Sequence, residues 1–264
     1  MILSISTMSA DWGDYDRDGR FDFFTTNFSR ESFQLFHNVG AGLFEHTEYQ
    51  VGVSTFIPLG FGAKWADLDN SGWPDIFCLC GNVYELPRSK DPADTFKEPS
   101  MLFYNEGGKK FVNIAPQVGG DLMRPILGRG LASGDYDNDG KIDFVAVDLE
   151  GPAMLLHNET PSTNHWVTLD LHSGSSNHFA YGALVTGRNG NQVWAGYVSP
   201  ASSYLSSSDP RLHFGLGQET QIDSLTIRWP SGKREVLKDL AADHIWRIDE
   251  GKGSKIETPA SPTP

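Results

Sequence analysis

Short apolar stretches separated by turn residues follow one another along the chain. FDFFTTNF, PDIFCLCG and IDFVAVDL are three of them. Runs of this length, rich in β-branched and aromatic residues, are typical of β-strands because such side chains pack well on a pleated sheet. The chain holds 28 glycines and 15 prolines and has no long helical period, so the pattern predicts an all-β fold of many short strands joined by turns.

Three copies of one pattern organise these strands up to about residue 158. Each copy contains a strand, an acidic loop, a second strand and an apolar stretch that ends at asparagine, as in FQLFHN, MLFYN and AMLLHN. The first two copies then add a glycine turn and one more strand. A repeated four-stranded antiparallel sheet is the blade of a β-propeller. We therefore expect a partial β-propeller of three four-stranded blades over residues 1–158, at about 5–55, 56–118 and 124–158.

The pattern changes after residue 158. Stretches such as HWVTLDL, DSLTIRW and HIWRIDE, with turns between them, predict a small β-sandwich-like domain over residues 159–250. Residues 251–264 predict a disordered tail. Propellers close with about four to eight blades. We therefore expect the chain to be the C-terminal part of a larger protein, or to associate through the open edge of its propeller.

The acidic loop of each copy follows the spacing D-x-D-x-[D/S]-G-x-x-D. Side chains at positions 1, 3, 5 and 9 and the backbone carbonyl at position 7 offer oxygen ligands. These candidates are Asp14, Asp16, Asp18, Arg20 and Asp22; Asp67, Asp69, Ser71, Trp73 and Asp75; and Asp135, Asp137, Asp139, Lys141 and Asp143. Glycine at position 6 allows a sharp turn around an ion. Oxygen ligands in this number suit Ca²⁺, so the loops predict up to three calcium ions, with the Ser71 loop the weakest.

Other interpretations of the loops fit less well. An EF-hand needs a glutamate at position 12, where these loops have Thr25, Cys78 and Ala146. Magnesium demands tighter octahedral geometry, and the loops lack the histidine and cysteine ligands of zinc. The remaining alternative is an aspartate-rich, hydrogen-bonded turn without a metal.

The net charge and the cysteines limit which partners and which bonds between residues the sequence favours. The formal net charge is −13, and nucleic-acid-binding proteins instead carry basic patches, so we expect no nucleic acid partner. Cys78 and Cys80 lie two apart in a predicted strand, which favours a pair of buried thiols over a disulfide. The sequence shows no transmembrane run, and its first residues lack the features of a signal peptide. We therefore expect no membrane insertion and no signal peptide in this chain.

The loops and their flanks resemble FG-GAP repeats, also called VCBS or integrin-α-type propeller repeats, over about residues 5–158. Residues 182–217 and the stretch IDSLTIRWPSGKREVL resemble the ASPIC/UnbV domain, so the architecture is similar to that of the cartilage acidic protein group. The resemblance implies that the D-x-D-x-D-G-x-x-D loops bind calcium and stiffen the blades. It also implies an extracellular, cell-surface or periplasmic location.

No catalytic motif such as H-E-x-x-H, G-x-S-x-G or a phosphate loop is present in the sequence. His37 and His157 occupy the repeat position of Tyr104, which indicates packing. The segment SSYLSSSDP favours a hydrogen-bonded turn over a sugar site. We expect no enzyme but a calcium-binding module for adhesion or for binding an unidentified protein or carbohydrate. Alternatives are an accessory or catalytic domain of an extracellular hydrolase or lyase, and a structural spacer.

Overall fold

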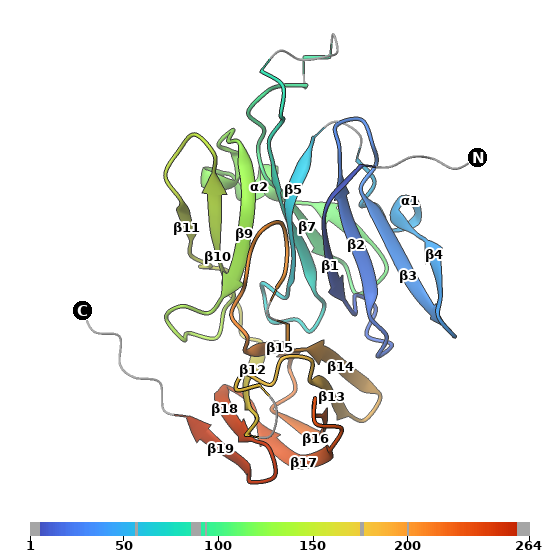
Figure 1. The fold of residues 1–264 in the computed structure, drawn as a ribbon, viewed down its shortest axis with the longest axis vertical. Helices are drawn as coiled ribbons and strands as arrows, with labels where there is room; N and C mark the ends of the chain where they lie inside the picture. The colour runs from blue at the N-terminus through green and yellow to red at the C-terminus, as the bar shows by residue number, and fades with distance from the viewer. Residues whose placement is uncertain are drawn as a thin grey trace.

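The chain is all-β, as the sequence predicted, and its five small sheets resemble a β-propeller in their arrangement (Figure 1). The computed structural model describes residues 6–55, 58–85, 91–92, 94–174, 177–199 and 201–257. The first residues of the predicted first blade and the end of the predicted tail, residues 258–264, lie outside this part.

The first two copies of the repeat each form a four-stranded antiparallel sheet in which the strand order follows the sequence. The first consists of β1 (Thr7–Gly13), β2 (Asp22–Asn27), β3 (Gln34–Gly40) and β4 (Leu43–His46). The second consists of β5 (Gly60–Ala66), β6 (Asp75–Cys80), β7 (Met101–Asn105) and β8 (Phe111–Asn113). Three short helical turns follow these sheets, namely α1 (Glu48–Val51), α2 (Ala115–Val118) and the 3₁₀ helix η1 (Gly120–Met123).

The third copy forms a sheet of three strands. These are β9 (Gly128–Gly134), β10 (Asp143–Asp148) and β11 (Met154–Leu156). The prediction of three four-stranded blades is therefore wrong for this copy within the described residues. After β11 the sequence has no glycine turn before β12, and it contains Pro161, which cannot donate to a strand ladder.

The strands β1, β5 and β9 lie next to one another and bring the three sheets together (Figure 1). Aromatic side chains fill the space between the first two sheets, among them Phe24 and Trp65. Phe77 and Phe144 pack at 4.7 Å between the second and third sheets. This packing leaves all three acidic loops facing the C-terminal strands. Cys78 and Cys80 are buried free thiols, which confirms that prediction.

The C-terminal strands form two more four-stranded sheets, which we call together the C-terminal unit. In sheet order they are β15 (Leu212–Gly217), β12 (His165–His172), β18 (His244–Asp249) and β19 (Gly253–Glu257), and β14 (Gln192–Tyr197), β13 (Leu184–Asn189), β16 (Gln221–Arg228) and β17 (Arg234–Ala241). One core, which includes Val167, Trp194 and Ile227, joins the two sheets. The prediction of a disordered tail from residue 251 is wrong for Gly253–Glu257, which forms a strand paired with β18.

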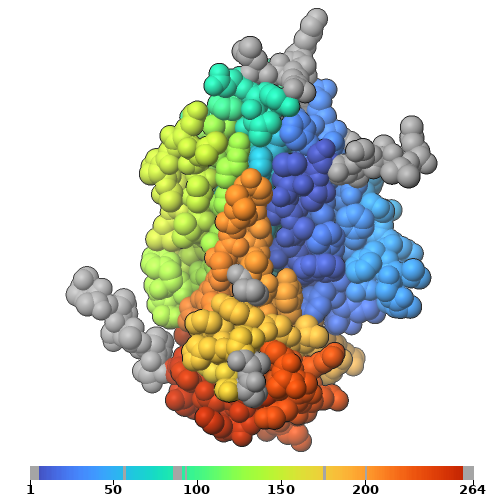
Figure 2. All heavy atoms as spheres, viewed as in Figure 1, coloured from blue at the N-terminus to red at the C-terminus, as the bar shows by residue number. Residues whose placement is uncertain are grey.

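The serine-rich segment between β14 and β15, residues 202–210, runs upward along the inner strands (Figures 1 and 2). The hydroxyl of Ser206 accepts the amide of Leu131 at 3.0 Å, and that of Ser208 accepts the amide of Ser133 at 3.1 Å. The Tyr204 ring packs against Phe61 with centroids 4.9 Å apart. The segment is hydrogen-bonded as predicted, but its partners belong to the propeller-like sheets, so it joins the two parts of the chain.

Candidate functional site

Each acidic loop gathers three aspartates into a tight group. Carboxylate oxygens of positions 1, 3 and 9 lie within 4.8 Å of one another in all three copies. The groups are Asp14, Asp16 and Asp22; Asp67, Asp69 and Asp75; and Asp135, Asp137 and Asp143. Positions 1 and 9 are buried and position 3 is half-buried. Two further groups place Asp18 with Asp16 and His37, and Asp139 with Asp137 and His157, so the structure brings together eleven of the predicted ligands.

The backbone of each loop wraps around its first aspartate. In the first loop, Asp14 accepts the amide of Asp18 at 3.1 Å and the amide of Gly19 at 2.9 Å. Asp67 and Asp135 accept the amides of positions 5 and 6 in the same way. Gly19, Gly72 and Gly140 at position 6 have φ values of 87°, 89° and 84°. Glycine adopts this left-handed conformation without a steric penalty, which explains its place in every copy.

The predicted ligands at position 5 point partly toward position 7. Asp18 accepts the amide of Arg20 at 2.8 Å, and Asp139 accepts the amide of Lys141 at 2.9 Å. The Ser71 hydroxyl accepts the Trp73 amide at 3.4 Å. The ligand role of position 5, and that of the carbonyls at position 7, stays a prediction.

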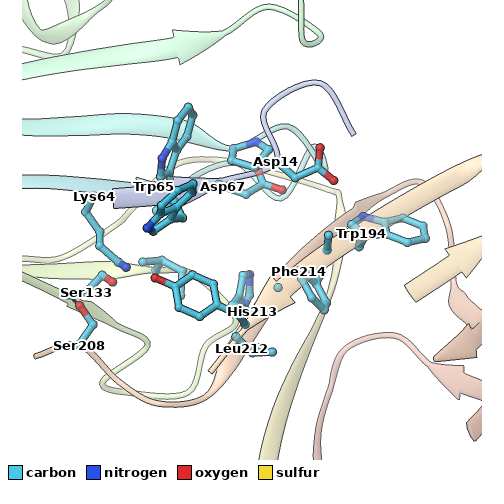
Figure 3. A pocket seen from close by; sticks show the side chains of 18 of the residues that line it. Asp14, Lys64, Trp65, Asp67, Ser133, Trp194, Ser208, Leu212, His213 and Phe214 are labelled. Atoms are coloured by element: carbon cyan, nitrogen blue, oxygen red, sulfur yellow. Dashed lines mark hydrogen bonds between the residues drawn. The ribbon is translucent and has the colours of Figure 1, made fainter. Parts of the chain in front are cut away.

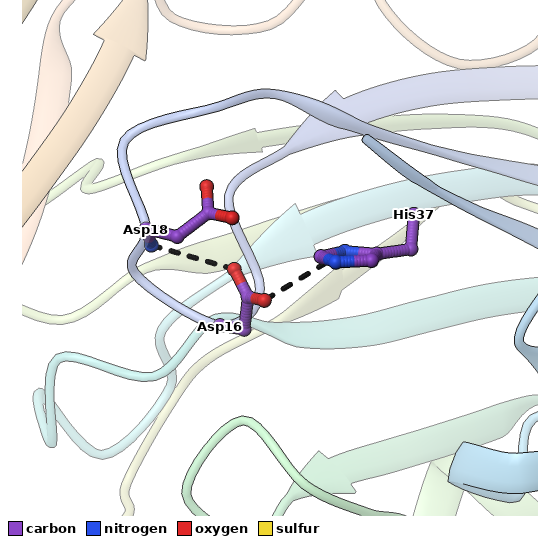
Figure 4. A group of neighbouring side chains, drawn as sticks. All are labelled: Asp16, Asp18 and His37. Atoms are coloured by element: carbon purple, nitrogen blue, oxygen red, sulfur yellow. Dashed lines mark hydrogen bonds and ion pairs between the residues drawn. The ribbon is translucent and has the colours of Figure 1, made fainter. Parts of the chain in front are cut away.

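One ring in or just after the third strand of each sheet contacts the loop carboxylates, whereas the sequence indicated only packing for these rings. His37 Nδ1 lies 3.7 Å from Asp16 Oδ2, as Figure 4 shows, and it also lies 3.1 Å from Asp22 Oδ1. His157 Nε2 lies 3.3 Å from Asp137 Oδ2, and the Tyr104 hydroxyl donates to Asp69 at 3.1 Å. The sequence did contain a sign of this contact, because every copy has a ring with a polar atom at this position.

The asparagine that ends each of these stretches supports the same carboxylates. The backbone amides of Asn38, Asn105 and Asn158 donate to the aspartate at position 9 of their own loop, each at 2.8 Å. The Asn105 side chain also donates to the Tyr15 carbonyl at 3.0 Å, and that of Asn158 to the Leu68 carbonyl at 2.9 Å. Each of these two asparagines therefore ties its own loop to the loop of the preceding sheet.

Burial and mutual repulsion disfavour the ionised aspartates of the loops. Burial, with the charges of Asp18 and Asp16, raises the pKa of Asp14 to about 7. Burial raises the pKa of Asp75 to about 7 and that of Asp135 to about 6. Each loop therefore holds carboxylates that a cation would stabilise in the charged form.

The oxygen donors of the loops fit a hard divalent cation. Each group offers three carboxylates at short range, which is the donor chemistry of Ca²⁺ and Mg²⁺. Asp137 Oδ1 is buried and has no hydrogen-bond partner among the described residues. An unpaired buried carboxylate oxygen is costly, so a bound cation would relieve this cost.

The raised pKa values predict how the stability of the metal-free protein depends on pH. The pKa of Asp14 and of Asp75 is about 7 in the folded chain, above the ordinary aspartate value of 3.8. Folding therefore favours their protonated forms, and this stabilisation is complete below about pH 4 and is lost as the pH rises through about 7. With a chelator, we therefore expect the free energy of unfolding to fall between about pH 4 and about pH 7, by up to about 1.4 kcal/mol per pH unit for each carboxyl, and to level off above about pH 8.

Urea denaturation in chelator at several pH values in this window measures the effect. Asp75→Asn removes one of the carboxyls with a raised pKa and serves as the matched variant, so the slope of its stability against pH should be shallower than that of the wild type. A stability that is constant or rises over this window in the wild type would contradict the prediction.

A cavity of about 190 Å³ lies between the loops, the inner strands and the C-terminal unit. Figure 3 shows Asp14 and Asp67 on one side of it and His213 and Phe214 on the other. Lys64 pairs with Asp11 at 3.1 Å on the cavity wall, so these two charges compensate one another. The cavity therefore marks the boundary between the two parts of the chain, next to the metal candidates.

Family comparisons agree with both parts of this architecture. Residues 14–78, which contain the first two acidic loops, match the family described as an FG-GAP-like repeat. Residues 173–255 match the family described as ASPIC and UnbV. The chain is therefore similar to FG-GAP-like repeats in its first part and to the ASPIC and UnbV family in its second part. This confirms the resemblance that the sequence indicated.

Three similar proteins of known name are all called Cartilage acidic protein 1. The chain is 26% identical to the mouse protein over 274 residues, which cover 85% of this chain and 42% of the mouse protein. The human protein is 26% identical over 274 residues, with 85% and 40% covered, and the Xenopus tropicalis protein is 28% identical over 148 residues, with 52% and 20% covered. The chain thus spans about two fifths of the length of the mouse and human relatives.

The FG-GAP-like and ASPIC and UnbV descriptions name no catalytic activity. No helix in the described part of the chain is long and apolar enough to cross a membrane.

Proposed function

We propose that the chain is a calcium-binding, non-enzymatic module of an extracellular protein that presents its surface to a protein or carbohydrate partner. The observation that carries the proposal is that each of the three loops groups three buried or half-buried aspartates, with carboxylate oxygens within 4.8 Å of one another. The FG-GAP-like match and the similarity to proteins named Cartilage acidic protein 1 support an adhesion-like role outside the cell.

The aspartates at positions 1, 3 and 9 would hold each ion, joined by position 5 and the carbonyl at position 7. Bound calcium would supply the positive charge that lets buried carboxylates stay ionised. The amides of positions 5 and 6 orient the first aspartate, and the asparagine amide orients the last. We further propose that residues 124–158 serve as a short blade and that residues 159–250 form a sandwich-like domain.

A group of aromatic side chains on the first sheet favours a binding role. It also favours association through the open edge of the propeller, where this sheet lies. Trp12 is 41% exposed and packs against Phe23 with centroids 4.5 Å apart. Phe36 lies 5.8 Å from Phe23, and Phe44, which is 40% exposed, packs against Trp12 with centroids 6.2 Å apart. Aromatic faces supply much of the contact energy in protein interfaces and are stable platforms for partners.

Calorimetric titration of chelator-stripped protein with calcium tests the proposed function. We expect close to three ions per chain, with dissociation constants of about 10⁻⁴ to 10⁻³ M, as is usual for extracellular modules. The loop with Ser71 has one carboxylate fewer, so it should be the weakest site.

A variant separates this site from the others. Ser71→Asp restores the missing carboxylate and should tighten the weakest site, whereas Asp67→Ala should remove that site and leave about two ions per chain. The absence of any calcium-dependent heat would contradict the proposed function.

A further inference from the structure

The outward-facing residues of all three acidic loops contact the C-terminal unit. Positions 1, 3 and 9 carry the grouped carboxylates, whereas positions 4 and 6 of the same turn contact other parts of the chain. Arg17, Asn70 and Asn138 stand at position 4 and share a positive φ of 60°, 58° and 59°. Each of them forms a hydrogen bond with the C-terminal unit or with the segment that leads into it.

Arg17 of the first loop is bound most extensively. Its guanidinium group donates to the Gln192 side chain at 2.7 Å, and its Nε donates to the Val193 carbonyl at 3.2 Å. The guanidinium carbon also lies over two indole rings, 4.8 Å from that of Trp194 and 5.0 Å from that of Trp73. Burial of a charge against these partners stabilises a single arrangement of the loop and β14.

Asn70 of the second loop contacts β15. Its side-chain oxygen lies 2.7 Å from His213 Nε2, while its side-chain nitrogen donates to the Gly140 carbonyl of the third loop at 2.8 Å. His213 Nε2 is therefore the donor, and its Nδ1 accepts from the Thr168 hydroxyl at 3.0 Å. Burial lowers the pKa of His213 to about 4, so the ring is neutral at neutral pH.

Asn138 of the third loop contacts the segment that enters β15. Its side-chain oxygen accepts from Arg211 at 2.7 Å, and the same guanidinium group donates to the Asp135 carbonyl at 2.9 Å. Arg211 is positioned in turn by an ion pair with Asp209. Arg211 therefore forms hydrogen bonds with positions 1 and 4 of the third loop.

The glycines at position 6 face the same unit. A Cβ atom at Gly140 would lie 2.0 Å from the Trp166 ring, and one at Gly72 would lie 3.3 Å from the Gly215 carbonyl. A Cβ atom at Gly19 would lie 3.4 Å from a methyl group of Val193. All three turns are therefore covered closely by strands β12, β14 and β15.

We infer that the three loops form a docking platform for the C-terminal unit and that cation occupancy sets the geometry of this platform. The inference rests on the proposed calcium binding. One short backbone turn carries both the ligands and the docking residues, so a change in the ligand positions moves positions 4 and 6. Without an ion the carboxylates repel one another and loosen the turn. Linkage then requires that docking in turn strengthens cation binding by the same factor.

Hydrogen exchange of the full chain, in calcium and in chelator, tests the inference alongside calorimetry of the same samples. Chelation should speed exchange of the amides in residues 192–193 and 213–217 by about tenfold, within the usual range of coupling between sites. The amide of Gly217 is a sensitive probe, because it donates to the Asn70 carbonyl at 2.8 Å.

Arg17→Ala tests the platform without removing a candidate ligand. It should still bind about three ions, but with several-fold weaker affinity at one site, and residues 192–193 should exchange faster even in calcium. Arg188→Ala removes an exposed arginine of β13 and is the matched control, which should behave as the wild type.

The outcomes separate the inference from the proposed function. If calcium binds but the exchange rates in residues 192–193 and 213–217 do not depend on calcium, the coupling is overturned and the calcium binding stands. Equal behaviour of Arg17→Ala and Arg188→Ala would also overturn it. No calcium binding at all would overturn both.

Discussion

Replacement of Gly215 with alanine is expected to destabilise the chain by about 3 kcal/mol, at the upper end of the usual cost of overpacking. A Cβ atom at this buried position of β15 would lie 2.0 Å from Asp67 Oδ2 and 2.5 Å from the Asn70 Cα atom. The clash involves both a candidate ligand and the loop backbone, so relaxation has to move the second loop or β15. Urea denaturation measures the loss, and calorimetry should show a weaker second site.

Gly174→Ala is the control for this substitution. A Cβ atom at Gly174 would meet nothing within 4 Å, and no left-handed φ is required there. Its effect on stability should be within about 0.5 kcal/mol. If the two variants have the same denaturation midpoint, the close packing of β15 against the second loop is wrong.

Asp137→Ala is expected to lower stability mainly when calcium is present. At a calcium concentration about 100 times the dissociation constant, one site stabilises the folded chain by about 2.7 kcal/mol. Loss of this site should lower Tm by roughly 5–10 °C in a chain of this size. In chelator the change should be small, because the variant also removes a charge that repels Asp135 and Asp143.

Thermal unfolding in calcium and in chelator measures the difference. Asp121→Ala, in the exposed 3₁₀ helix η1, removes one carboxylate outside the loops and should show no calcium-dependent change. An equal loss of stability for Asp137→Ala in both conditions would show that Asp137 acts in folding alone.

The candidate ligands could be predicted from the sequence because the chemistry is local. Positions 1, 3 and 9 lie within nine residues, and glycine at position 6 marks the turn that brings them together. The contacts of His37, Tyr104 and His157 with these carboxylates come from a later strand. Their shared position in the repeat pointed to a common role, but only the strand pairing places each ring beside its loop.

The role of position 4 could not be predicted, because it depends on contacts between distant parts of the chain. Arg17 and Gln192 are 175 residues apart, and no local pattern relates them. The residues at position 4 of the three loops are arginine, asparagine and asparagine, and residues of these types are typical of exposed turns. The strand β19 escaped prediction for a similar reason, since GSKIE is polar and becomes a strand by pairing with β18.

The serine-rich segment also prevents a strand of another chain from pairing with the edge of β9. Its hydroxyls take the amides of Leu131 and Ser133, which are alternate groups on one edge of β9. An unprotected edge of this kind is a template on which another chain can extend the sheet. Because hydroxyls rather than a regular row of backbone carbonyls meet these amides, the segment ends the sheet without becoming a new template. The serine-rich segment, which joins the two parts of the chain, therefore also protects the edge of β9 against fibril-like growth.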